Sequence, residues 1–183
     1  MKWGHGKMVY ASENYYEGNW ENNKRNGHGE MHWLSSNERY SGNWKDNLQH
    51  GFGTHIWLDN SSNNKLLRNR YVGYWANGLR HGKGTFYYSN GSKYEGEWCD
   101  NYKHGQGVFT WPDGRHYQGQ FKNDKKHGHG VLTYPKNKKS KNEVQGRKYS
   151  GDWVEDKKDG RGRYEWPDGS VYEGEFKNNN ISG

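Results

Sequence analysis

The stretch Tyr94-Glu95-Gly96-Glu97-Trp98, together with Gly105-Gln106-Gly107-Val108-Phe109-Thr110-Trp111-Pro112-Asp113-Gly114, decides the fold. Aromatic side chains and glycines occupy alternate positions in both parts of it. Alternate residues of a β-strand point to the same face of a sheet. The stretch therefore predicts two short antiparallel strands whose rings and glycines share one face, while residues such as Glu95 face water.

The same series recurs along the whole chain, which indicates a repeat array rather than a conventional domain. Tyr117 begins the next copy 23 residues after Tyr94. Complete repeats begin at residues 16, 40, 71, 94, 117 and 149, and half-repeats occupy residues 1–15 and 172–183. Two inserts, 58–70 and 135–148, interrupt the period. Because the chain begins and ends within a repeat, we expect a piece of a longer array or ends that something else caps.

The pattern predicts an all-β protein whose core lies on one face of a single antiparallel sheet. Glycine weakens a strand unless another group must approach the backbone closely. Because the glycines share a face with the rings, we expect each ring to lie over the glycines of a neighbouring strand. The predicted core rings are Tyr16, Trp20, Tyr40, Trp44, Tyr71, Trp75, Tyr94, Trp98, Tyr117, Phe121, Tyr149 and Trp153. The predicted core glycines are Gly27, Gly29, Gly51, Gly53, Gly82, Gly84, Gly105, Gly107, Gly128, Gly130, Gly160 and Gly162.

The segments between repeats carry turn residues. Pro112-Asp113-Gly114 and Pro167-Asp168-Gly169 have proline and glycine at favoured turn positions, and Asn90-Gly91 is a hairpin signal. No segment has a sustained helical period, and 27 glycines oppose helix formation. The sequence therefore predicts strands joined by turns, without helices.

Composition excludes several classes of protein. Only 28% of the residues are hydrophobic but 16% are aromatic, which argues against disorder because disordered chains contain few aromatics. The single cysteine, Cys99, excludes a disulfide within the chain and fits a reducing compartment, so we expect the cytoplasmic side of the cell. No apolar run approaches the ~18 residues of a membrane span.

The positive charge is concentrated in one insert. The net charge is +7, and residues 135–148 hold six basic side chains against the single acid Glu143. That insert therefore carries +5, which leaves +2 for the rest of the chain. The nearly neutral remainder argues against binding to nucleic acid or membrane lipid, and the aromatic residues that could stack on bases already occupy core positions.

The sequence contains no pattern that predicts catalysis or a cofactor. His50, His81, His104 and His127 recur once per repeat, so neighbours would lie ~10 Å apart, too far to share a zinc ion. A role in structuring the turns is the better interpretation. Cys99 has no cysteine partner, which argues against a structural zinc site. The Gly-x-Gly pairs lack the complete phosphate-loop motifs. We expect no metal, no cofactor and no enzyme activity.

The inserts have two interpretations. They are either solvated loops or a pair of docking loops for a partner. The candidate interaction residues are Lys65, Arg68, Arg70, Lys136, Lys138, Lys139, Lys141, Arg147 and Lys148.

The series Tyr-x-Gly-x-Trp, six residues and Gly-x-Gly resembles the MORN repeat, and the resemblance covers essentially the whole chain. It implies an elongated, twisted antiparallel sheet. A narrower resemblance, to the radial spoke head 10 homologue B family, rests on residues 16–23 with 26–29, on 51–55 with Trp57, and on 67–69 leading into Tyr71. Residues 86–88 before Gly91, and 176–178 with 181–183, also fit that family.

These resemblances imply a non-catalytic scaffold of the radial-spoke head in the axoneme of cilia or flagella. The implied partners are other radial-spoke head proteins, and the edges or ends of the sheet could also support self-association. Two alternatives stay open at this point: a phospholipid- or membrane-apposed tether, and an accessory module of a larger enzyme.

Overall fold

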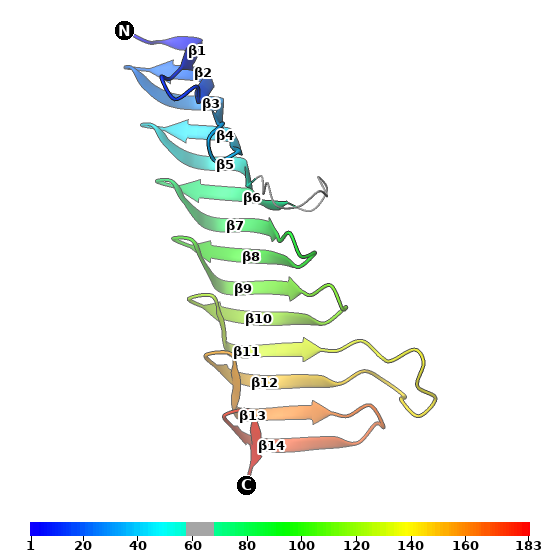
Figure 1. Ribbon diagram of the computed structural model, residues 1–183. Helices are drawn as coiled ribbons and strands as arrows, with labels where there is room; N and C mark the ends of the chain where they lie inside the picture. The colour runs from blue at the N-terminus through cyan, green and yellow to red at the C-terminus, as the bar shows by residue number, and fades with distance from the viewer. Residues whose placement is uncertain (58–67) are drawn as a thin grey trace. The chain divides into compact units, whose positions relative to one another are not determined.

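The computed structural model describes residues 1–57 and 68–183, and every regular element in these residues is a β-strand. The strands are antiparallel and follow one another in chain order in a 15-stranded sheet, as predicted (Figure 1). They are β1 (Gly4–Val9), β2 (Tyr15–Glu21), β3 (Lys24–Trp33), β4 (Glu38–Lys45), β5 (Leu48–Trp57), β6 (Asn69–Ala76), β7 (Leu79–Tyr87), β8 (Lys93–Cys99), β9 (Tyr102–Thr110), β10 (His116–Lys122), β11 (Lys125–Thr133), β12 (Lys148–Val154), β13 (Lys157–Glu165), β14 (Val171–Lys177) and β15 (Asn180–Ser182). None of the described segments is a helix long and apolar enough to cross a membrane.

The chain divides into two compact units, and each is described by itself. The first unit comprises residues 1–91 and 98–101, and the second comprises residues 92–97 and 102–183. In both units each repeat contributes one hairpin, and consecutive hairpins pair through their neighbouring strands.

The tyrosine rings lie over glycines of the neighbouring strand, which confirms the packing predicted from the period. A Cβ added to Gly29 would lie 2.6 Å from Cε2 of Tyr16, and one added to Gly107 would lie 2.5 Å from Cε2 of Tyr94. Both distances are far inside van der Waals contact. The absence of a side chain at these glycines therefore lets the rings bury against the sheet itself.

The buried rings form chains of edge-to-face contacts from one repeat to the next. Tyr16 lies 5.0 Å from Trp20 of its own repeat and 5.4 Å from Trp44 of the following repeat, both nearly perpendicular to it. Its hydroxyl donates a hydrogen bond to the carbonyl of Asn19 at 2.9 Å. Trp44 Nε1 donates to the carbonyl of Gly29 at 3.0 Å. Each ring thus buries its apolar area and satisfies its polar atom at the same time.

The prediction that all core glycines share a face with the rings is wrong for the first glycine of each Gly-x-Gly pair. The β2–β3 register pairs Gly18 with Gly29 but Trp20 with Arg25, so Gly27 falls in a β-bulge with φ +84. The bulge breaks the period of two on which the prediction depended. The equivalent glycines with positive φ are Gly51, Gly82, Gly105, Gly128 and Gly160.

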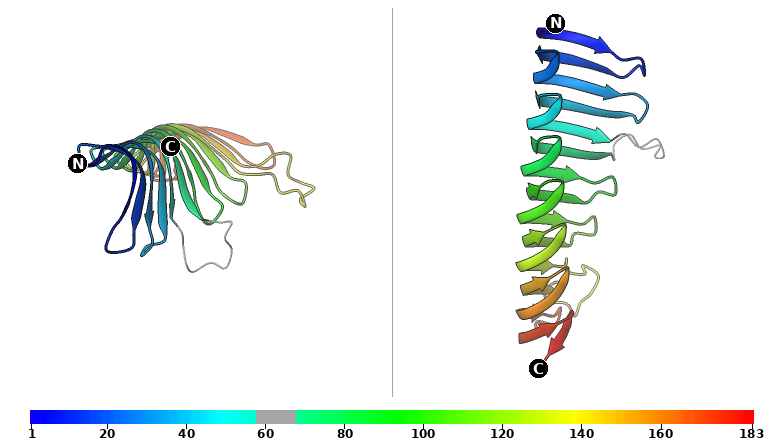
Figure 2. Two further views of the ribbon diagram at one scale, coloured as in Figure 1. Left: turned by 90° about the horizontal axis from the view of Figure 1, so that it is seen from above. Right: turned by 90° about the vertical axis from the view of Figure 1, so that its left-hand side faces the viewer.

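Each hairpin closes through two residues that both have positive φ, as type I′ turns require. Asn22 and Asn23, for example, have φ of 49° and 66°. Within each unit these turns form a row along one side of the strands, which we call the turn edge, and the longer connections form the opposite loop edge (Figure 2). The predicted turns are confirmed on the loop edge, where Gly114 N donates to Trp111 O at 3.0 Å and Gly91 N donates to Tyr88 O at 3.0 Å.

Candidate interaction surface

The turn edge carries a row of basic side chains that the sequence analysis did not single out. Where the residue two positions after a turn is basic, it lies over aromatic rings: Arg25 is 4.9 Å from the ring of Trp44, and Lys126 is 5.3 Å from that of Trp153. Such contacts are attractive because the face of an aromatic ring is electron-rich. Arg80, Lys103 and Lys158 are further members of the row, and Gln49 stands in the same position without a charge. Lys2 extends the row just before the first strand, 5.1 Å from the ring of Trp20, although no turn precedes it.

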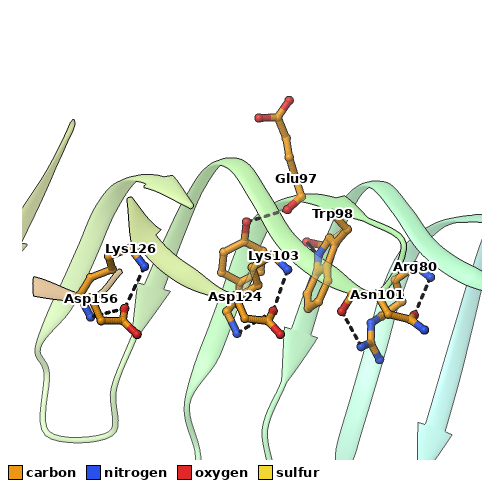
Figure 3. Close-up of polar contacts among 10 residues, drawn as sticks. Arg80, Glu97, Trp98, Asn101, Lys103, Asp124, Lys126 and Asp156 are labelled. Carbon is orange, nitrogen blue, oxygen red and sulfur yellow. Dashed lines mark hydrogen bonds and ion pairs between the residues drawn. The ribbon is translucent and has the colours of Figure 1, made fainter. Parts of the chain in front are cut away.

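In the second unit two of these cations form ion pairs with the turn of the following repeat. Lys103 Nζ lies 3.6 Å from Asp124, and Lys126 Nζ lies 3.2 Å from Asp156 (Figure 3). The two lysine side chains are only 15% and 17% exposed. Because their charge is paired and largely covered, we assign these two lysines to cohesion between repeats rather than to partner binding.

The second insert is fastened to the next repeat of its own unit. Val144 N donates to the carbonyl of Pro167 at 2.8 Å, and Gln145 Nε2 donates to the carbonyl of Trp166 at 3.2 Å. Asn137 N donates to a carboxylate oxygen of Glu143 at 2.9 Å, which closes the loop on itself. The insert is therefore a folded loop on the loop edge. Its predicted interaction residues Lys136, Lys138, Lys139 and Lys141 are all exposed.

A cavity of about 290 Å³ lies between this insert and the adjoining turns. The guanidinium groups of Arg115 and Arg147 lie 5.8 Å and 5.1 Å from the ring of Tyr134, which is half-buried. Arg115 Nε also lies 2.8 Å from Asp113. The remaining lining includes Pro135, Asn137, Glu143 and Pro167. We call this cavity and the four exposed lysines the basic loop surface.

Two pKa shifts involve the arginines that line this cavity: one at Lys158, which lies outside the basic loop surface, and one at Asp113. Burial lowers the pKa of Lys158, and the nearby positive charge of Arg147 lowers it further. At Asp113, the hydrogen bond from the backbone of Arg115 holds the pKa of the carboxyl below its usual value, and the guanidinium of Arg115 acts in the same direction. Asp113 therefore stays ionised and offsets part of the positive charge at one wall of the cavity.

The other predicted interaction residues are placed separately. Lys65 lies outside the described residues. Arg70 is exposed in β6, and its guanidinium covers the ring of Tyr87 at 4.3 Å, while Arg68 is half-buried just before that strand. Lys148 is half-buried as the first residue of β12. These positions leave the second insert as the place where the structure gathers exposed cations around a cavity.

The repeated histidines are the third residues of β5, β7, β9 and β11, and contacts with the turn of the following repeat are seen for His81 and His127. Each precedes the positive-φ glycine of the bulge. His127 Nδ1, for example, accepts a hydrogen bond from the backbone nitrogen of Glu155 in the following turn, at 3.4 Å. At the same position in the last repeat, Asp159 accepts from the backbone nitrogen of Asn178 at 3.3 Å.

His55 is a buried polar residue to which the sequence analysis assigned no role. It is 6% exposed and stacks on the rings of Trp33 and Trp57, at 5.5 Å and 4.1 Å. Its Nε2 lies 2.9 Å from the carboxylate of Glu38. Its position in the repeat could have indicated burial, because the apolar Met31 occupies the same place in the preceding repeat.

A second cavity, of about 320 Å³, lies in the first unit on the face opposite the buried rings. Its lining includes His5, Glu17, Asn19, His28 and Glu30. The two carboxylates give it a polarity opposite to that of the basic loop surface.

Comparison with known proteins identifies the repeats. A family model for the MORN repeat matches residues 1–15, 16–37, 40–62, 71–93, 94–114, 117–139, 149–171 and 172–183. MORN repeats are generally non-catalytic modules for interaction with proteins or membranes. No curated protein matches the chain. The family matches cover most of the sequence and coincide with the hairpins described above, and the chain therefore belongs to the MORN-repeat family.

Proposed function

We propose that this chain is a non-catalytic scaffold of the radial-spoke head in the ciliary or flagellar axoneme. We further propose that the basic loop surface binds an acidic segment of another spoke-head protein. The axonemal assignment rests on the sequence resemblance to the radial spoke head 10 homologue B family. The docking assignment rests on the geometry of the second unit.

The observation that carries the docking proposal is a set of exposed cations on a loop that is already ordered. The hydrogen bonds from Val144 and Gln145 to the next repeat fix the loop, so a partner need not order it on binding. Preorganisation of this kind improves affinity because less conformational entropy is lost. Guanidinium groups flanking an aromatic ring, as at Tyr134, suit carboxylates and aromatic side chains of a protein ligand.

Charge reversal of the insert tests this function. Lys136, Lys138 and Lys139 are replaced with Glu in the tagged full-length protein, and its neighbours in a ciliated cell are identified by proximity labelling. The matched control replaces Lys122, Lys125 and Lys157, which are exposed lysines on the turn edge of the same unit, with Glu. Both variants change the net charge equally. A difference in the labelled neighbours therefore depends on where the charge was changed, and not on the total charge.

We expect the unmodified protein to label spoke-head proteins, the insert variant to lose them, and the control to keep them. Equal labelling by both variants would contradict docking at the basic loop surface. Signal at a membrane or at the cell cortex would instead contradict the axonemal assignment. Flotation with anionic liposomes then measures the tether alternative, for which each lysine near the surface adds ~1 kcal/mol.

A further inference from the structure

We propose that His81, Cys99 and Asp100 form a three-ligand site for a zinc-class divalent cation at the Asp100–Asn101 turn of the first unit. The inference is independent of the function proposed above. Among the described residues, these three form the one group whose imidazole, thiol and carboxylate atoms converge in this way.

The ligand atoms are close to the separations that one ion requires. His81 Nδ1 lies 3.2 Å from Asp100 Oδ1, and the ligand atoms of all three residues lie within 4.8 Å of one another. Bonds of ~2.1 Å to nitrogen or oxygen and ~2.3 Å to sulfur, arranged as a tetrahedron, place ligand atoms ~3.3–3.6 Å apart. The nitrogen and oxygen already meet that spacing, and rotation of the Cys99 side chain can supply the rest.

The backbone around the site is held by hydrogen bonds between adjacent repeats. Arg80 N donates to Asn101 Oδ1 at 3.0 Å, and Asn101 N donates to Arg80 O at 3.0 Å (Figure 3). Arg80 precedes His81 and Asn101 follows Asp100, so this pair fixes the distance between the two segments that carry the ligands. Support of this kind around the ligands commonly strengthens metal binding.

Other repeats show that the fold does not require these three residues together. At the equivalent positions His50 is accompanied by Ala76 and Asn77, and His104 by Lys122 and Asn123. The same bulge and turn therefore form without a thiol or a carboxylate. A histidine, a cysteine and an aspartate coincide in one repeat only, where they add a potential ligand set to a common frame.

The chemistry of the ligands favours zinc or cobalt over magnesium or calcium. Thiolate and imidazole are preferred by zinc-class ions, whereas magnesium and calcium prefer oxygen ligands alone. The side chains of His81 and Asp100 are 47% and 64% exposed, so an ion can reach them from solvent. An ion bound at Nδ1 requires the proton of the neutral imidazole to reside on Nε2, and the Cys99 thiol releases its own proton on binding. Three protein ligands leave the fourth position for water.

Titration of the full chain with Co²⁺ tests the site, because cobalt replaces zinc and absorbs light when bound by a thiolate. We expect one Co²⁺ per chain, a thiolate-to-cobalt charge-transfer band, release of protons, and displacement of cobalt by Zn²⁺. Cys99→Ala removes the band. His81→Asn and Asp100→Asn weaken binding by at least about tenfold, since loss of a supporting residue alone typically costs that much.

The substitutions are residues that other repeats carry at these positions, namely Asn26, Ala76 and Asn123, so each variant retains a sequence that this fold accepts. His50→Asn is the matched control and leaves the band and the affinity unchanged. Absence of the charge-transfer band in excess Co²⁺ would overturn the proposal. So would unchanged affinity in His81→Asn, or one Co²⁺ per two chains, because either result places the ion elsewhere or between copies.

Discussion

Asn47 and the backbone of Arg25 exchange two hydrogen bonds across neighbouring repeats of the first unit. Asn47 N donates to Arg25 O at 3.0 Å, and Arg25 N donates to Asn47 Oδ1 at 2.9 Å. The second turn residue is Asn or Asp in the other repeats except at Gly78, which makes only the backbone bond, from its nitrogen to Gln49 O at 2.9 Å. The turns thus extend the hydrogen-bonded ladder beyond the strands. At Gly78 the ladder lacks the hydrogen bond that an Asn or Asp side chain accepts in the other repeats.

Substitutions at these turns should change stability in opposite directions. Asn47→Gly removes the side-chain bond while tolerating φ of 70°, and we expect it to lower the free energy of unfolding by about 0.5–1.5 kcal/mol. Gly78→Asn should raise it by about 1 kcal/mol, because asparagine tolerates positive φ and can accept from Gln49 N. Urea denaturation measures both changes.

The environment of Gly78 permits this gain. A Cβ there would lie 3.6 Å from Leu48 Cδ2 and 3.7 Å from Gln49 Oε1, which are ordinary contact distances. Asn22→Gly, at the first position of a turn, is the control and should change stability by less than about 0.5 kcal/mol. A destabilised Gly78→Asn variant would show that the side-chain bonds do not strengthen the ladder.

The sheet and its core could be predicted because their cause lies in local spacing. Tyr94, Gly96 and Trp98 alternate in sequence, and alternation has one structural meaning in a strand. The bulge at Gly105 could not be predicted from that rule, because an inserted residue looks like any other member of the period. The bond between Asn47 and Arg25 was also hidden, since it depends on how separate turns align.

The candidate site was predicted only in its composition. The lysines of the second insert showed that the site is basic. The sequence could not decide between a solvated loop and a docking loop, because residues 135–148 do not include the groups that hold the loop in place. The anchor is the carbonyl of Pro167, a backbone atom in the next repeat. The approach of His81 to Cys99 was similarly invisible, because it arises between a bulge and a turn 18 residues further along.

A methyl group under a tyrosine ring should be costly. Gly107→Ala places a Cβ 2.5 Å from Tyr94 Cε2, and the ring cannot move without breaking its hydroxyl bond to Glu97 O at 2.8 Å. We expect destabilisation by about 1–3 kcal/mol or more, as for other overpacked cores, and a larger loss for Gly107→Val. Thermal unfolding measures the change. Gly6→Ala is the control, because its Cβ would lie 3.7 Å from Trp20, and a midpoint equal in both variants would refute the packing argument.

The buried tyrosines should make the fold sensitive to alkali. Burial raises the pKa of Tyr16 and Tyr149 to about 12, and it raises the pKa values of Tyr40, Tyr71 and Tyr117 as well. The unfolded chain loses these protons near pH ~10, at which the folded chain retains them. Stability is therefore complete below pH ~10 and falls as the pH rises toward 12.

Alkaline titration, followed by tyrosinate absorbance and circular dichroism together, should show ionisation and loss of the sheet in one cooperative step. Tyr40→Phe should lower stability at neutral pH by about 0.5–1.5 kcal/mol, because it loses the bond to Asn43 O. The same variant should lose less stability between pH 10 and 12. Ionisation of the core tyrosines well before the sheet unfolds would contradict their burial.

The burial of His55 should make stability depend on pH on the acidic side. Burial lowers the pKa of His55 and the charge of Arg80 acts in the same direction, although the hydrogen bond to Glu38 opposes them. The unfolded chain therefore binds a proton at His55 near pH ~6.5, before the folded chain does. This contribution is complete above pH ~6.5 and is lost as the pH falls through the lowered pKa of the folded state.

His55→Met, which copies Met31, removes the titrating group. The unfolding free energy of the wild type minus that of the variant should therefore decrease from pH 7 to pH 5, as measured by urea denaturation. A difference that stays constant or grows over that range would show that Glu38, rather than burial, decides the protonation of His55.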